Sequence, residues 1–163
     1  MANETSIRNY TLFNNGSLQL TVPDSWRDKT EQQLKHLPPT VTFTPLNGTS
    51  FHILLSPMWA YREGVSLPSL EDTKQLIDIA AEHAREQAVE GSIKKHEFKN
   101  TGNKGYYYST TDKAPKPGEY KYMTQGMIHI GDLFATFTIL TNDDSVDIGD
   151  TALKMINGAE HIN

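Results

Sequence analysis

The chain has 163 residues, enough for one domain that closes its own core without disulfides or a structural metal. Hydrophobic residues make up 37% and charged residues 21%, which excludes an intrinsically disordered chain, and no apolar run approaches the ~20 residues of a membrane-spanning helix. The formal net charge of −5, with only short basic runs, disfavours nucleic acid as a partner.

Two β-hairpins are predicted in the first third of the chain. Residues 9–13 and 17–22 alternate apolar and polar side chains on either side of an Asn-Asn-Gly turn, which favours positive φ. Residues 40–44 and 49–56 flank a second turn of this kind, Asn-Gly. Residues 27–39 are polar and end in two prolines, so we expect an irregular connection there.

One long amphipathic helix is predicted from Ser69 to Glu90. Asp72 stands three residues after Ser69, a short version of the capping box, and Gly91 suits the position after a helix end. The apolar stripe consists of Leu70, Thr73, Leu76, Ile77, Ala80, Ala81, Ala84 and Ala88. Its alanines indicate close approach to a sheet.

The second half of the chain is again rich in strands. Strands are predicted at residues 92–98, 106–111, 119–130 and 133–140, and a closing helix begins near Asp147. Helices on both sides of a sheet bury their apolar stripes against it. The sequence therefore predicts a single α+β domain over residues 1–163, with a central, mostly antiparallel β-sheet sandwiched by helices and a core spanning about residues 9–159.

Three segments are similar to a known superfamily. Residues 18–28 run from a strand into Pro23-Asp24-Ser25-Trp26, residues 105–108 form a Gly-Tyr-Tyr-Tyr segment, and residues 125–140 run from Gln-Gly into Phe-Thr-Ile-Leu. Together they resemble the PsbP-like superfamily, which also includes the Ran-binding Mog proteins and the bacterial DcrB-like domains. The resemblance spans roughly residues 9–159 and implies an α/β/α sandwich.

The resemblance also implies a broad kind of function. Members of this superfamily act mainly as binding or assembly proteins: photosystem subunits, a GTPase partner, envelope proteins and chaperone-like adaptors. None of their partner-recognition residues can be placed in this sequence, and shared fold alone does not define function.

The residues alone do not decide in which cellular compartment the protein works. The first five residues are polar, which fits either a cytoplasmic protein or a mature domain whose signal segment has been removed. The absence of cysteine fits both compartments. The resemblance favours an exported, periplasmic bacterial protein.

No catalytic constellation is visible in the sequence. The chain has no cysteine and no Gly-x-Ser-x-Gly motif, and its Gly-rich segment at residues 101–105 leads into a strand rather than a helix, unlike a phosphate-binding loop. We therefore expect a protein that is not an enzyme and that needs no cofactor.

The histidines suggest an alternative function, the binding of a metal ion or small ligand. His83 and Glu86 lie three residues apart on the predicted long helix, and His96 follows on a strand. They could hold a metal ion or a small ligand, although the further ligands that a metal site needs at known spacing are missing. The competing interpretation is a solvated helix face.

The main hypothesis about function, the binding of a protein or peptide, rests on aromatic residues. Tyr107 lies within a run of three strand tyrosines, Tyr120 and Tyr122 are two apart on the next predicted strand, and Trp59 and Tyr61 lie in a loop. If they converge on an uncovered sheet face, they form a recognition patch; otherwise they are ordinary core and rim residues. The sequence thus predicts a non-enzymatic binding or adaptor domain that holds a protein or peptide on an exposed sheet or loop surface.

Overall fold

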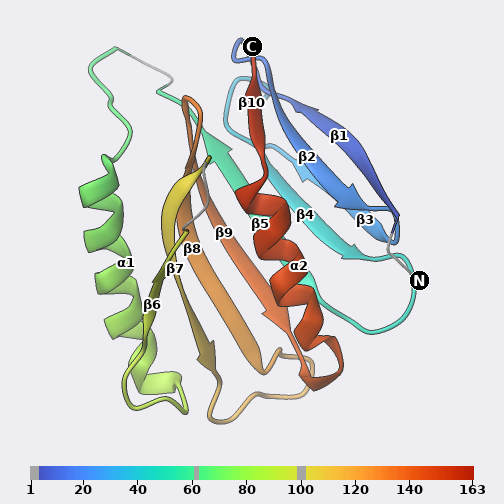
Figure 1. The fold of residues 1–163 in the computed structure, drawn as a ribbon, viewed down its shortest axis with the longest axis vertical. Helices are drawn as coiled ribbons and strands as arrows, with labels where there is room; N and C mark the ends of the chain where they lie inside the picture. Colours follow the sequence, from blue (N-terminus) through green and yellow to red (C-terminus); the bar gives the residue numbers. More distant parts are fainter. Residues whose placement is uncertain (1–3, 61–62, 99–101) are drawn as a thin grey trace.

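The computed structural model describes residues 4–60, 63–98 and 102–163 of the chain. These residues form two antiparallel sheets and two α-helices (Figure 1). The smaller sheet has the order β1-β2-β10 and consists of β1 Thr5–Thr11, β2 Ser17–Pro23 and β10 Glu160–Ile162. The seven-stranded sheet has the order β3-β4-β5-β9-β8-β7-β6 and consists of β3 Trp26–Glu31, β4 Thr40–Pro45, β5 His52–Met58, β6 Lys95–Glu97, β7 Lys104–Thr111, β8 Tyr122–Ile130 and β9 Leu133–Thr141. The predicted α+β fold is confirmed.

The long helix begins where the sequence predicts. In α1 (Leu70–Ala84) the Ser69 hydroxyl accepts the Asp72 N–H at 3.1 Å, and the Asp72 carboxylate accepts the Ser69 N–H at 3.3 Å. This is the reciprocal pair of a capping box, which satisfies two backbone donors that the helix itself leaves unpaired.

The predicted end of that helix at Glu90 is wrong. After α1 the chain makes one 3-10 turn, η1 (Arg85–Gln87), and then Ala88 takes an extended conformation and pairs with Asp112. The Glu90 carboxylate accepts both the N–H (2.9 Å) and the hydroxyl (2.7 Å) of Thr111. Pairing with the end of β7 therefore removes residues 88–90 from the helix, although their sequence continues its apolar stripe.

One face of the seven-stranded sheet, the α2 face, is covered by the smaller sheet and by α2 (Val146–Asn157), which follows the short 3-10 helix η2 (Asp143–Ser145). Leu18 and Leu20 of β2 pack in one continuous core with Phe137 of β9. Helix α2 contributes Ala152, Met155 and Ile156 to the same core. Successive side chains of a strand point to opposite faces, so alternate residues of β2, β4 and β5 are buried here.

The opposite face, the α1 face, is covered by α1. Ile77 and Ala81 of α1 pack against Tyr108 of β7 in a small buried cluster separate from the main core. Lys95 of β6 forms an ion pair with Asp78 of α1 at the edge of the sheet. The alanine in this contact allows the helix to approach the sheet closely.

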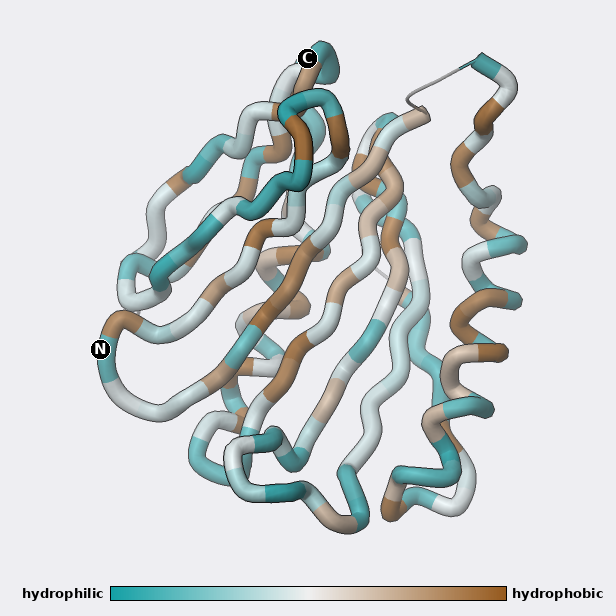
Figure 2. The backbone as a smooth tube through the Cα atoms, turned by 180° about the vertical axis from the view of Figure 1, so that it is seen from behind, coloured by the Kyte–Doolittle hydropathy of each residue, from teal (hydrophilic) through white to brown (hydrophobic). Residues whose placement is uncertain are grey.

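The two coverings are displaced along the sheet. Helix α1 contacts β6, β7 and β8, whereas α2 contacts β9 and β2. Figure 1 shows α1 beside the β6 edge and α2 across the middle of the sheet, and Figure 2 shows the other side of the central strands with no helix crossing them. The predicted sandwich is therefore present, but each helix covers only some of the strands on its face of the sheet.

Two strands were not predicted. The polar segment from Arg27 to Glu31 belongs to β3, an edge strand paired with β4, and β10 follows α2 and pairs with β2. Exposed charged residues are common on edge strands because they discourage pairing with another chain. Both strands therefore lack the apolar alternation by which strands are recognised in a sequence.

Candidate functional site

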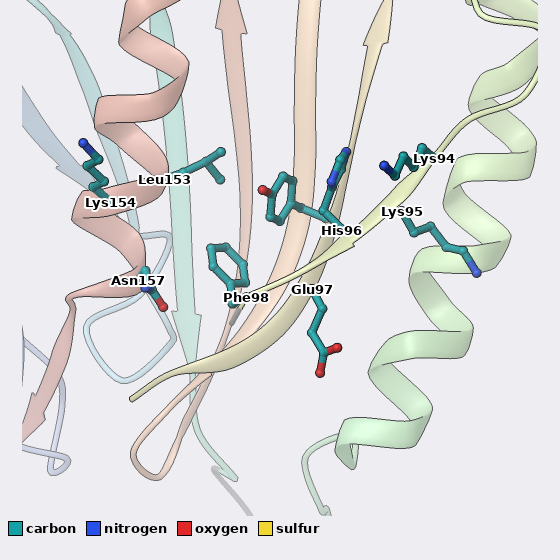
Figure 3. Close-up of a pocket in the computed structure, with 9 residues that line it drawn as sticks. Lys94, Lys95, His96, Glu97, Phe98, Leu153, Lys154 and Asn157 are labelled. Atoms are coloured by element: carbon teal, nitrogen blue, oxygen red, sulfur yellow. The ribbon is translucent and has the colours of Figure 1, made fainter. Parts of the chain in front are cut away.

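A groove of about 590 Å³ lies on the α2 face, between α2 and strands β6 and β7 (Figure 3). We refer to it as the aromatic groove. Its main lining residues are His96, Phe98, Tyr107, Leu153 and Asn157. It is the place where a side wall, supplied by α2, meets a sheet surface that no helix covers.

Three rings lie in contact along the floor of the aromatic groove. His96 and Tyr107 are paired across β6 and β7, and their ring centroids lie 5.0 Å apart at an interplanar angle of 20°. Phe98, two residues after His96 and therefore on the same face, has its ring centroid 5.0 Å from that of Tyr107. Strand register and alternation thus bring these rings together.

A glycine makes room for these rings. Gly126 of β8 pairs with Tyr107 on one side and Phe137 on the other. A Cβ atom at Gly126 would lie 2.3 Å from Cζ of Phe137 and 2.7 Å from Cβ of Tyr107. Glycine in a strand is unfavourable unless a neighbouring group needs the space, and here two aromatic side chains use it.

Charge is distributed unevenly around the aromatic groove. Figure 3 shows Lys94 directed toward the ring of His96, whereas Lys95 is directed toward α1, where it pairs with Asp78. Burial raises the pKa of Tyr107, and the negative charge of Asp150 raises it further. The Tyr107 phenol is therefore neutral near pH 7 and acts as a hydrogen-bonding group.

The far end of the aromatic groove is closed by the end of α2. The Asn103 side-chain amide lies 2.9 Å from the Asn157 carbonyl oxygen and 2.8 Å from that of Ala159, so it caps carbonyls that the helix leaves unpaired. The side-chain oxygen of Asn157 is buried and has no hydrogen-bond partner among the described residues. It is an unused acceptor at this end of the groove.

The tyrosines of the predicted patch that the structure describes do not converge on one surface. Tyr107 lies in the aromatic groove, but Tyr120 precedes β8, bonds to the Ser50 hydroxyl at 2.8 Å and lines another pocket. Tyr122 lies at the start of β8 and donates to Asp143 at 2.6 Å. The prediction that Tyr120 and Tyr122 share a strand face is wrong because β8 begins only at Tyr122.

The loop aromatics also differ from the prediction. Trp59 is 5% exposed and belongs to the main core, so it is not part of an exposed surface. It follows β5 directly, and burial of its large apolar ring favours this position. Tyr61 lies outside the described residues.

The three predicted metal ligands are not gathered into one site. His83 is exposed on α1 and Glu86 is exposed on η1, both on the α1 side of the sheet. His96 points to the opposite side, since it alternates with Lys95, which reaches α1. Among the described residues, no group of three or more histidines, aspartates and glutamates is placed to hold a metal ion.

Phe98 and Leu153 line the aromatic groove but were not among the residues that the sequence indicated, and His96 lies there beside Tyr107 and not beside His83 and Glu86. One pattern could have indicated the first of these: His96 and Phe98 share a strand face two residues apart. The contribution of Leu153 depends on where α2 crosses the sheet, which no local pattern specifies.

Comparison with known proteins supports the fold. No protein-family model and no curated protein sequence matches the chain. The structure is similar to the solution structure of cyanobacterial PsbP (CyanoP) from Synechocystis sp. PCC 6803, with a TM-score of 0.50 and 11% sequence identity over 99% of this chain and 95% of that chain. The chain therefore has a PsbP-like fold, as the sequence resemblance implied. No helix within the described ranges is long and apolar enough to cross a membrane.

Proposed function

We propose that this protein is a non-enzymatic binding domain that holds a peptide segment of a partner protein in the aromatic groove. The observation that carries the proposal is the contact of the Tyr107 ring with His96 and with the buried Phe98, beside α2 on a sheet surface that no helix covers. Aromatic side chains with one apolar and one polar end are enriched at protein interfaces, because they bury a large area and still form hydrogen bonds.

The shape and chemistry of the groove favour an extended segment with an apolar or aromatic side chain. Such a side chain would lie over Tyr107 and against Leu153 of α2. Lys94, directed into the groove, would pair with a carboxylate of the segment. Asn157 would accept a backbone N–H after rotation of its side chain. These are binding groups, and we propose no reaction for them.

We further propose that the protein works outside the cytoplasm of a bacterium, in the periplasm. This rests on the resemblance to exported members of the PsbP-like superfamily. Cell fractionation followed by immunoblotting tests it. Recovery of the native protein with cytoplasmic markers would contradict this part of the proposal and leave the groove proposal intact.

The groove proposal is tested by selecting peptides from a random display library and measuring their affinity for matched variants. We expect His96→Ala to weaken binding about two- to tenfold, the usual contribution of an aromatic pair. His83→Ala makes the same chemical change on the exposed face of α1 and should leave the affinity unchanged. Equal effects of the two substitutions would contradict the assignment of the site.

NMR chemical shifts give an independent readout. Addition of a selected peptide should move the amide signals of Phe98, which follows β6, of Tyr107 on β7 and of Leu153 on α2. Shifts confined to the other side of the sheet would place the partner elsewhere and overturn the proposal.

A further inference from the structure

A second pocket lies on the α1 face, where the end of α1, η1, the segment 112–121 and strands β8 and β9 meet. We refer to it as the α1-end pocket. Its volume is about 510 Å³, within the range of about 300–1,000 Å³ typical of small-ligand sites. Its apolar wall consists of Ala84, Met123, Leu140 and the ring of Tyr120.

The segment that forms the outer wall is anchored at several points. The Asp112 N–H donates to the Lys121 carbonyl at 2.8 Å, and the Lys113 N–H donates to the Gln87 carbonyl of η1 at 3.0 Å. The Tyr120 and Ser50 hydroxyls are 2.8 Å apart. The first bond closes the segment on itself, and the other two join it to η1 and to Ser50. The pocket is therefore formed before any ligand arrives, and a ligand would not bear the cost of ordering it.

Among the described residues, the α1-end pocket has a net negative charge, because its one lysine is already paired and its two carboxylates are not. The Lys121 ammonium is held by Asp143 of η2 at 3.1 Å. Asp112 and Glu119 also line the pocket, and within the described part of the chain neither forms an ion pair. Each of these two carboxylates accepts one backbone N–H from its own segment, which leaves acceptor capacity for a ligand.

We propose that the α1-end pocket binds a small amphiphilic amine. The apolar part of the ligand lies against Ala84, Met123 and Leu140, and its ammonium group pairs with the carboxylates of Asp112 and Glu119. The ring of Tyr120 adds a surface that attracts a cation. This site is separate from the aromatic groove, which lies on the opposite face of the sheet, and it does not depend on the peptide proposed there.

Three probes that share one ring and differ in charge test this proposal. They are 2-phenylethylamine, the neutral 2-phenylethanol and the anionic 3-phenylpropionate, each titrated into the full chain and followed by NMR. We expect the amine to bind about tenfold more tightly than the alcohol, because hydrogen bonds to charged groups are the strong ones. The amine should shift the signals of Met123, Leu140 and Thr110.

Two variants separate the contributions of charge and shape. Asp112→Asn combined with Glu119→Gln keeps the hydrogen-bonding oxygens and should remove the preference for the amine over the alcohol. Ala84→Leu fills the apolar end and should abolish binding of both probes. Glu71→Gln, at the exposed start of α1, is the control. It should change neither the affinity for the two probes nor the preference for the amine.

Thermal unfolding of each variant shows whether it is folded before binding is compared. Equal affinity for the amine, the alcohol and the carboxylate would overturn the proposal. So would the absence of amine binding at millimolar concentration, or shifts confined to the aromatic groove. Unchanged amine binding by Ala84→Leu would also overturn it, because the ligand would then lie elsewhere.

Discussion

The two faces of the seven-stranded sheet are covered by different amounts of structure. On the α2 face, the smaller sheet and α2 bury one continuous core that includes Leu20, Phe43 and Ile139. On the α1 face, a single helix buries a cluster built on Ile77, Ala81 and Tyr108. Buried apolar area is the main source of stability, so we expect the α2 face to contribute more to the stability of the fold than the α1 face does.

The two proposed binding sites also differ in how they are joined to the main core. The aromatic groove is a continuation of the main core, since its Phe98 ring contacts Phe137 with centroids 5.9 Å apart. The α1-end pocket is built from the end of a lightly attached helix and an anchored surface segment. We therefore expect damage to the main core to affect both sites, and damage to the α1 cluster to affect the α1-end pocket alone.

The largest effect is expected from Ile139→Ala. Ile139 is 2% exposed on the central strand β9, and deleting a buried isoleucine side chain to alanine costs roughly 2–5 kcal/mol of unfolding free energy. Denaturant unfolding measures the loss. Thr136→Ala, on the open side of the same strand, should cost at most about 1 kcal/mol. Similar losses from the two substitutions would show that the two faces contribute equally.

Ile77→Ala should have a smaller and more local effect. We expect the unfolding free energy to fall by about 2 kcal/mol, the lower end of the range for such substitutions. The reason is that the cluster around Ile77 is small and lies at the side of the sheet. Hydrogen exchange should accelerate in α1 while the amides of β9 stay protected. The control is Ile79→Ala, since Ile79 is 57% exposed and should change stability by no more than about 0.5 kcal/mol. Faster exchange throughout β9 would contradict a separate α1 cluster.

Gly126→Ala tests the link between the main core and the aromatic groove. The added methyl group would meet the Phe137 and Tyr107 side chains, and overpacking of this kind typically costs about 1–3 kcal/mol. Thermal unfolding measures the loss, and the ring signals of Tyr107 should move. Gly91→Ala is the matched control, because a Cβ atom there meets no atom within 4 Å. A stable Gly126→Ala variant with unchanged Tyr107 signals would show that the floor does not depend on this glycine.

The smallest expected effect is a pH dependence on the α1 face. His129 of β8 lies 3.0 Å from the Thr73 hydroxyl of α1, and burial lowers its pKa below the ordinary value of 6.5. The unfolded chain therefore takes up the proton first as the pH falls. This contribution to stability is complete above the unfolded pKa and decreases between that pKa and the lower folded one.

Urea unfolding of the wild type and of His129→Gln, between pH 7.5 and 5, measures this contribution. The wild type should lose more stability than the variant over the interval below about pH 6.5, the unfolded pKa of histidine. Parallel losses in the two proteins would show that the burial of His129 has no energetic consequence.

The sequence correctly predicted the turns and the helix start, because these depend on a few neighbouring residues. The Asn14 and Gly16 positions of the first turn have φ values of 54° and 68°, as an Asn-Asn-Gly turn favours, and the capping box at Ser69 starts α1. Strand alternation also predicted which residues of β2 and β4 are buried. It failed for β3 and β10, because an exposed edge strand and a three-residue strand show no such alternation.

The sequence by itself determined the fold class, the turns, the start of the long helix and the absence of familiar catalytic motifs. Only the tertiary structure decided where function can reside. It buried Trp59, separated Tyr120 from Tyr122, and placed His83 and His96 on opposite sides of the sheet. It also joined His96, Phe98 and Tyr107 in the aromatic groove. The physical reason is that turns and caps depend on neighbours a few residues away, whereas a groove depends on which strands of a sheet each helix leaves uncovered.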